Sequence, residues 1–217
     1  MTRQFHHQLD EMRKHVLDMG EMAKRNLLNG TKSLTDLDVA LAEEVIALDA
    51  SLNKMDVSLE AEILNLIARH QPMGTDLRTL GASLKIITYL DRIGRYGYDI
   101  AKVTKEFGGK SHVRKLVAIP LMAKTVGEMV DNALLAYKTS QAQPAREVFA
   151  MDETVDALYD QVFRQCVTFM LEDPATISQC AHYILVARHL ERAGDNACKV
   201  AEKTKYMITG ERRLPNY

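Results

Sequence analysis

Residues 89–105 read YLDRIGRYGYDIAKVTK, and residues 189–205 read HLERAGDNACKVAEKTK. Each stretch has an acid followed by Arg, a glycine three residues after the acid, and then apolar residues at helical spacing before Thr-Lys. A phrase that recurs after 100 residues indicates that the chain contains a duplicated unit. The two copies differ in charge at one equivalent position, where the first has Arg95 and the second has Asp195.

Helical signals run through the whole chain, whereas strand signals are nearly absent. Leu, Ala, Met, Lys and Glu recur at spacings of three and four residues, which is typical of amphipathic helices. Breaks rich in Pro, Gly and Asp separate six expected long helices at about 5–30, 38–70, 76–108, 113–140, 144–171 and 175–209. Helices of this length that are joined by short loops favour antiparallel bundles.

The expected helices also match in threes. Asp91 in the third helix corresponds to Glu191 in the sixth, and the breaks at Pro72 and Pro174 fall in equivalent places. The sequence therefore predicts an all-α fold of two tandem three-helix bundles that are related by internal duplication. We expect the first bundle to comprise residues 1–108 and the second to comprise residues 111–217.

The composition disfavours several functional classes. The 217 residues carry a formal net charge of −1, so no overall field attracts nucleic acid, which is not expected as a partner. No apolar run approaches the roughly 20 residues that cross a bilayer, and the N-terminus lacks the apolar core of a signal peptide. The 3 cysteines form no CxxC motif, which indicates free thiols in a reducing compartment. We therefore expect a cytoplasmic protein without a transmembrane segment.

Carboxylates occur in pairs, four residues apart, beside the apolar stripe of two helices in the second half. Asp152 and Asp156 form one pair, and Glu191 and Asp195 form the other. Like charges at this spacing repel each other on a helix, and the repulsion costs more where water is excluded. Two such pairs on facing helices would place four carboxylates together. Such a group requires protons, basic partners or a metal ion.

The first half carries a degenerate version of this set. Asp49 is followed four residues later by Asn53, and Asp91 is followed by Arg95. An Asn side chain still offers an oxygen, whereas Arg cannot bind a metal and brings its own positive charge. We expect Arg95 to take the place of a cation by pairing with Asp49, Asp91 or Asp99. The set of four acids is therefore complete in the second half only.

The second copy, with ER-x-GD at residues 191–195, resembles the signature of the PhoU family of phosphate-signalling regulators. Further landmarks of the family occur in the same order at residues 5–9, 19–22, 44–49 and 71–78. The resemblance therefore extends over essentially the whole chain. It implies a tandem of three-helix bundles, the same architecture that the duplication predicts.

The resemblance also implies a function. PhoU proteins restrain phosphate uptake and phosphate-starvation signalling when phosphate is plentiful, through the ATPase subunit of a phosphate ABC transporter and a phosphate-sensing histidine kinase. Acidic motifs of the family bind multinuclear metal clusters with iron or zinc. Carried over position by position, the resemblance implies such a metal in the second bundle only, on Asp152, Asp156, Glu191 and Asp195. Association with the membrane would occur through these partners only. Whether the protein forms a homodimer stays open from the sequence.

Two other functions remain open from the sequence. One is a carboxylate-bound metal enzyme or metal store on a helical bundle, and the other is a metal-free helical scaffold for another transporter. The Glu-x-x-His motif of ferritin-like di-iron proteins is absent, which disfavours a redox oxidase. There is no phosphate-binding GxxxxGK[ST] loop and no arrangement of a nucleophile with a base. We expect a regulator rather than an enzyme.

Overall fold

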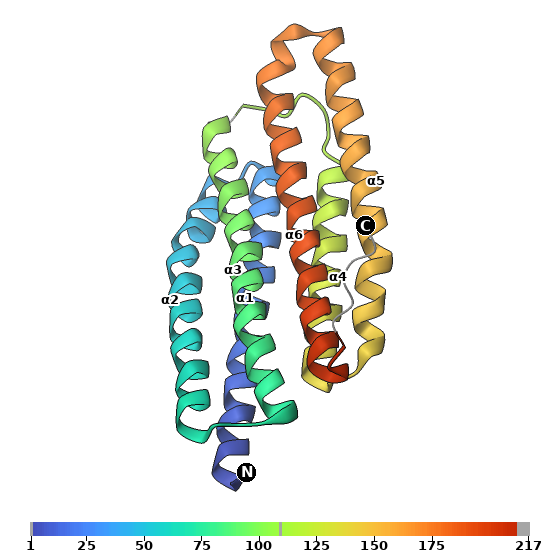
Figure 1. The fold of residues 1–217 in the computed structure, drawn as a ribbon. Helices are drawn as coiled ribbons and strands as arrows, with labels where there is room; N and C mark the ends of the chain where they lie inside the picture. Colours follow the sequence, from blue (N-terminus) through green and yellow to red (C-terminus); the bar gives the residue numbers. More distant parts are fainter. Residues whose placement is uncertain (1, 109, 212–217) are drawn as a thin grey trace.

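The computed structural model describes residues 2–108 and 110–211, and this part of the chain contains helices and no strand. The elements follow in the order α1 (Arg3–Asp36), α2 (Val39–His70), α3 (Gly74–Phe107), α4 (Ala118–Thr139), α5 (Ala142–Glu172), the short 3-10 helix η1 (Pro174–Thr176) and α6 (Ile177–Thr209). Successive long helices run antiparallel (Figure 1). The predicted all-α fold is confirmed. Over the described residues, no helix combines the length and the apolar character that crossing a bilayer requires.

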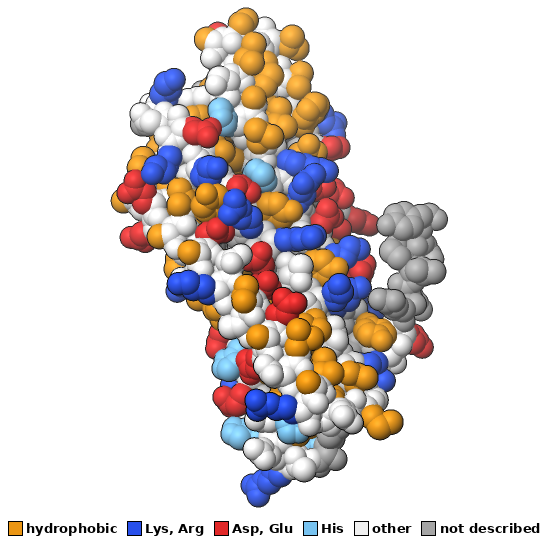
Figure 2. All heavy atoms as spheres, turned by 60° about the vertical axis from the view of Figure 1, so that its left-hand side comes forward, with side chains coloured by type: hydrophobic (Ala, Val, Ile, Leu, Met, Phe, Trp, Pro, Cys, Tyr) orange, Lys and Arg blue, Asp and Glu red, His pale blue; other side chains and the backbone are white. Residues whose placement is uncertain are grey.

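The six long helices form two groups of three, as the duplication predicted. α1, α2 and α3 contact one another, and so do α4, α5 and α6. The two groups meet where α3 packs on α6 and α1 packs on α4. These four helices form the centre of the molecule, while α2 and α5 lie on the outside (Figure 1). Charged side chains spread over the middle of the face shown in Figure 2, and hydrophobic side chains gather at one end.

The predicted end of the first helix at Gly30 is wrong, because α1 continues to Asp36. Gly30 lies inside the helix, against Gly97 of α3. A Cβ added to Gly97 would lie 2.7 Å from the backbone nitrogen of Leu27, closer than side-chain carbons approach backbone atoms. The two glycines therefore allow α1 and α3 to approach closely, and Gly30 does not act as a helix stop.

The predicted start of the fourth helix near Val113 is also wrong, because α4 begins at Ala118. Residues 110–117 form a non-helical connector between the two bundles. His112 fixes this connector, since its Nε2 donates to the carbonyl of Leu34 at 2.9 Å and its Nδ1 accepts from the Tyr183 hydroxyl at 2.9 Å. These contacts with α1 and α6 hold the connector outside a helix.

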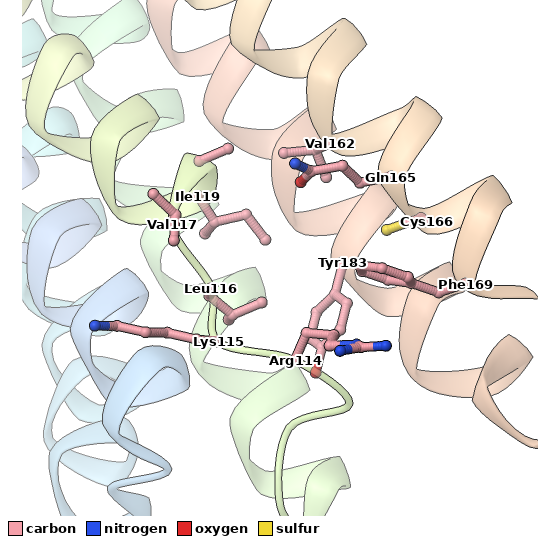
Figure 3. A pocket seen from close by; sticks show the side chains of 11 residues that line it. Arg114, Lys115, Leu116, Val117, Ile119, Val162, Gln165, Cys166, Phe169 and Tyr183 are labelled. Carbon is pink, nitrogen blue, oxygen red and sulfur yellow. The ribbon is translucent and has the colours of Figure 1, made fainter.

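An apolar cavity lies beside the connector. It has a volume of about 120 Å³ and opens between residues 114–119 and the helices α5 and α6 (Figure 3). Ile119, Val162 and Phe169 are among the side chains that line it, and none of its lining residues is acidic. α4 has 22 residues, whereas its counterpart α1 has 34. The shorter α4 covers less of the α5–α6 hairpin than α1 covers of α2 and α3, and the cavity lies where α4 is missing.

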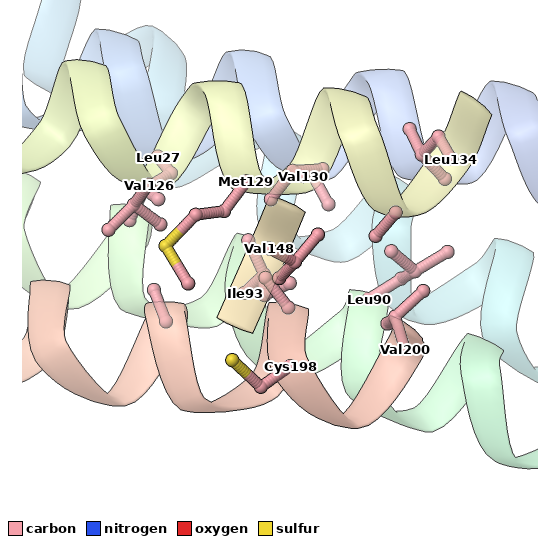
Figure 4. Close-up of a cluster of buried hydrophobic side chains, with 14 of the residues drawn as sticks. Leu27, Leu90, Ile93, Val126, Met129, Val130, Leu134, Val148, Cys198 and Val200 are labelled. Carbon is pink, nitrogen blue, oxygen red and sulfur yellow. The ribbon is translucent and has the colours of Figure 1, made fainter. Parts of the chain in front are cut away.

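One hydrophobic core runs through both bundles. Leu27 of α1 and Ile93 of α3 belong to the same buried cluster as Val126, Met129 and Val148 of the second bundle (Figure 4). Burial of such side chains is the main stabilising contribution to a helical fold. Because this core is continuous, the division into separate domains at residues 1–108 and 111–217 stays a prediction.

Candidate functional site

The four acids predicted as metal ligands lie on α5 and α6, which pack against each other. Asp152 and Glu191 are half-buried, whereas Asp156 and Asp195 are exposed. Asp152 lies opposite the glycine of the repeated phrase, because a Cβ added to Gly194 would be 3.6 Å from its Oδ1. The two acid pairs therefore lie near each other where α5 packs on α6.

Burial and mutual repulsion raise the pKa of three of these carboxyl groups. Burial is the largest cause for Asp152, followed by the charges of Asp156 and Asp195. Burial also comes first in raising the pKa of Asp195, and the charge of Asp156 adds to it. The pKa of Glu191 rises through burial and then through Asp195, against the opposing charge of Arg188. The four acids thus interact electrostatically, as their spacing predicted.

The two oxygens of Glu191 have different surroundings. Oε1 accepts a hydrogen bond from Nη1 of Arg188 at 2.7 Å, whereas Oε2 is buried and has no hydrogen-bond partner. A buried carboxylate oxygen without a partner is costly, and a bound cation would satisfy it.

The oxygen donors of these four acids fit a hard cation, or iron or zinc, in their chemistry. Their present positions do not form a finished site, since within residues 2–108 and 110–211 no three His, Cys, Asp or Glu side chains converge on one point. Asp156 and Asp195 are exposed to solvent. Binding would therefore require these two side chains to turn towards Asp152 and Glu191.

The equivalent positions of the first bundle contain an ion pair. Nη1 of Arg95 lies 2.8 Å from Oδ2 of Asp49, and its Nε lies 3.9 Å from Oδ1 of Asp99. These are two of the three partners expected for Arg95. Burial raises the pKa of Asp91, and the charge of Asp49 adds to this rise while Arg95 opposes it. Asn53 is exposed.

The family model described as PhoU domain matches the chain twice, at residues 16–104 and at residues 119–204. The chain belongs to the PhoU family. The duplicated unit of the sequence is therefore a repeated PhoU domain. A phosphate-specific transport system accessory protein PhoU homologue from Clostridium acetobutylicum is 34% identical over 213 residues, which are 97% of either chain. The homologue of the same name from Rhizobium meliloti is 31% identical over 207 residues, 95% of this chain and 87% of the relative.

Solved structures of PhoU proteins share the fold. The crystal structure of PhoU from Pseudomonas aeruginosa matches with a TM-score of 0.91 and 32% identity, over 95% of this chain and 100% of that chain. The phosphate transport system regulatory protein PhoU from Streptococcus pneumoniae matches with a TM-score of 0.87 over 95% of this chain and 98% of that chain. Its identity of 24% means that this second likeness concerns the fold alone.

One further acid of the first PhoU domain was missed in the sequence. Asp56 is half-buried, its Oδ1 has no hydrogen-bond partner, and its pKa is raised by burial and then by the charges of Asp91 and Glu60. Asp56 follows Asp49 by seven residues, which places both on one face of α2. That spacing could have identified it. The corresponding position of α5, seven residues after Asp152, is Tyr159.

A thiol lies beside the carboxylates of the second PhoU domain. Cys198 is buried on α6, and its interaction with Asp152 lowers the pKa of that carboxyl group against the stronger effect of burial. Burial and then the charge of Asp152 raise the pKa of Cys198, so the thiol stays protonated.

Proposed function

We propose that this protein regulates phosphate uptake as an accessory protein of a phosphate-specific transport system. The observation that carries the proposal is the match of almost the whole chain to relatives that bear this name. Those relatives are named as accessory proteins and not as enzymes, in agreement with the regulator expected from the sequence. The repeated PhoU domain and the shared fold support the same function.

In this proposal the protein acts by docking onto partners. They are the ATPase subunit of a phosphate ABC transporter and a phosphate-sensing histidine kinase, and the protein reaches the membrane through them. A cytoplasmic location belongs to the proposal, and the free, buried state of Cys166, Cys180 and Cys198 supports it. Phosphate-starvation signalling would be restrained through the same contacts.

The proposal includes a metal ion, iron or zinc, in the second bundle only. Asp152, Asp156, Glu191 and Asp195 would hold it, and the ion would offset the repulsion among these carboxylates. The raised pKa values and the unpartnered oxygen of Glu191 support this part of the proposal. In the first bundle, Arg95 already supplies a positive charge beside Asp49.

A complementation experiment tests the regulatory function. The gene is expressed in a bacterium whose own PhoU homologue has been deleted, and phosphate uptake is measured with radiolabelled phosphate in excess phosphate. We expect uptake to fall to the level of the parent strain. Uptake equal to that of an empty-vector control, with the protein present at normal abundance, would refute the function.

Elemental analysis of the purified full chain tests the metal site separately. We expect bound iron or zinc in the unmodified protein and in Asp91→Ala, but not in Glu191→Ala, its counterpart in the second bundle. Metal content that Glu191→Ala leaves unchanged would rule out the second-bundle site. Loss only on changing Asp49 would place the metal in the first bundle instead.

A further inference from the structure

The α5–α6 hairpin lacks, over its far half, the helix that covers the equivalent hairpin of the first bundle. The PhoU domain begins at residue 16 in the first copy and at residue 119 in the second, so equivalent positions of α1 and α4 are 103 residues apart. α1 starts at Arg3 and buries Phe5, Leu9 and Met12 as it packs on α2 and α3. α4 starts only at Ala118, the equivalent of residue 15, so no helix of the described residues covers the second hairpin in this way.

The apolar cavity beside the connector marks the place that the missing helix leaves open. Positions of α5 correspond to positions of α2 that are 103 residues earlier, and positions of α6 correspond to positions of α3 that are 100 earlier. The side chains of α5 that line the cavity include Val162, Cys166 and Phe169. Their counterparts in the first bundle are all buried, namely Leu59, Ile63 and Leu66. The connector therefore replaces the missing helix only in part, and about 120 Å³ stays unfilled (Figure 3).

This end of the second bundle is also basic. Residues 110–127, 161–171 and 174–190 contain six Lys or Arg and no Asp or Glu. The equivalent residues of the first bundle, 7–24, 58–68 and 74–90, contain seven Asp or Glu. At the cavity, the guanidinium of Arg114 lies 5.6 Å from the ring centre of Phe169, and Lys115 is exposed on the connector. The surroundings of the cavity therefore favour an anionic partner, although the whole chain has a net charge of −1.

We propose that the uncovered half of the α5–α6 hairpin receives an acidic amphipathic helix of a partner protein, with one apolar side chain of about the size of Leu in the cavity. The first bundle shows that this hairpin shape accepts a helix with apolar residues at i, i+4 and i+7, which are Phe5, Leu9 and Met12 of α1. A cavity of about 150 Å³ holds a benzene ring, so the present cavity fits one aliphatic side chain. Carboxylates of the partner helix would pair with Arg114 and Lys115. The proposal rests on the docking function proposed above and names the surface where docking occurs.

Fluorescence anisotropy with a labelled helical peptide of about 16 residues tests the surface directly. The peptide carries apolar residues at the spacing of Phe5, Leu9 and Met12 and Glu at its other positions, and a matched peptide carries Lys in place of Glu. We expect the full chain to bind the acidic peptide with a Kd of about 1–100 μM and to bind the Lys peptide at least about 10-fold more weakly. No binding of the acidic peptide, or equal binding of both peptides, would overturn the proposal.

Two double variants test the charge and the cavity. Arg114→Glu with Lys115→Glu should weaken binding of the acidic peptide at least about 10-fold. Lys54→Glu with Lys85→Glu is the matched control, because it changes the net charge equally at exposed positions of the first bundle, and it should bind like the unmodified chain. Normal binding by the charge-reversed chain, or an equal loss in the control, would overturn the proposal.

Val162→Leu with Cys166→Ile fills the cavity with the residues that the first bundle carries at these positions. The cavity gives them room, so the variant should fold normally, which circular dichroism checks. It should weaken binding of the acidic peptide at least about 10-fold, because the apolar anchor loses its place. Unchanged binding would contradict the role of the cavity.

The same titration distinguishes other occupants of the surface. Vesicles of phosphatidylglycerol should leave the peptide bound, and displacement of the peptide would assign the surface to an anionic membrane instead. The anisotropy should rise to a plateau with protein concentration. A decline at high concentration would show that a second copy of the chain competes for the surface. Either result would overturn the proposal.

The uptake experiment described for the phosphate function separates the surface from that function. The charge-reversed chain should fail to lower phosphate uptake in the deletion strain, whereas its matched control should lower uptake like the unmodified chain. Normal regulation by the charge-reversed chain would overturn the docking surface and leave the phosphate function standing. Failure of the unmodified chain would refute the phosphate function, and the peptide titration would still decide the surface.

Discussion

Neutralising one equivalent position in each bundle should change stability in opposite directions. Asp195→Asn removes a negative charge from a group of mutually repelling carboxylates, so we expect it to stabilise the metal-free protein at neutral pH. Arg95→Gln removes the cation that pairs with Asp49 and leaves the repulsion between Asp49 and Asp91, so we expect it to destabilise. The positions are 100 residues apart and occupy the same place in the two repeats.

The magnitudes follow from exposure. Arg95 is half-exposed, and ion pairs of this kind contribute about 0.2–1 kcal/mol to the free energy of unfolding. Each repulsion that Asp195 makes with its neighbours costs a similar amount, roughly 0.2–0.5 kcal/mol. For a chain of this length, 1 kcal/mol corresponds to about 2–4 °C in Tm. Asp195 repels Asp152, Asp156 and Glu191. Calorimetry on chelator-treated protein should therefore show a Tm about 1–6 °C higher for Asp195→Asn and about 0.4–4 °C lower for Arg95→Gln.

The pH dependence has a definite sign. A carboxyl group whose pKa is raised by folding binds its proton more tightly in the folded state, so its charge destabilises the protein above that pKa. The advantage of Asp195→Asn should therefore be largest near pH 7 and should vanish below the ordinary Asp value of 3.8. Both effects should shrink in 1 M salt, where charges are screened within about 3 Å. A lower Tm for metal-free Asp195→Asn at pH 7 would refute this reasoning.

Two further predictions concern packing. Gly97→Ala should lower the free energy of unfolding by about 1–3 kcal/mol, because the added Cβ would lie 2.5 Å from the carbonyl carbon of Asn26. On the same helix, a Cβ added at Gly81 meets nothing within 4 Å, so Gly81→Ala should raise the free energy of unfolding by about 0.5–1 kcal/mol. Urea titration of both variants checks this, and stabilisation by Gly97→Ala would contradict the close approach. Tyr137→Phe should lower the free energy of unfolding by about 1 kcal/mol, because it removes the buried 2.7 Å hydrogen bond to Ser83 that joins the two bundles. Unchanged unfolding in urea would contradict a stabilising role for this hydrogen bond.

The architecture could be predicted from the sequence because several independent signals agree. The repeated phrase, the helical spacing and the breaks at Pro72 and Pro174 all indicated six helices in two groups of three. The two wrong boundaries share one physical cause, which is contact between elements distant in sequence. Glycine is common at the ends of helices, yet Gly30 lies inside α1, where it contacts Gly97 of α3. Val113 is followed by residues that favour helices, such as Lys115 and Leu116, yet the hydrogen bonds of the adjacent His112 hold this connector outside a helix.

The candidate site was predictable in its residue types and less so in its geometry. Spacing placed Arg95 within reach of Asp49, and the 2.8 Å ion pair agrees with that expectation. Spacing could not say which oxygen of Glu191 is left without a partner, because that depends on the rotamer of Arg188. Asp56 was not predicted because the prediction rested on acids that occur in both repeats. The residue that corresponds to Asp56 in the second repeat is Tyr159, which is not an acid.

The differences between the two repeats separate what the fold needs from what function adds. Both repeats form the same three-helix bundle, so a position that tolerates opposite chemistry in the two copies is not set by folding. Position 195 is acidic where its counterpart is basic, and position 163 is aromatic where its counterpart is acidic. In both cases the second repeat carries the less stable choice, namely carboxylates that repel one another or exposed apolar surface. Such choices are retained when a ligand or a partner offsets their cost. The second bundle is therefore where binding should be sought.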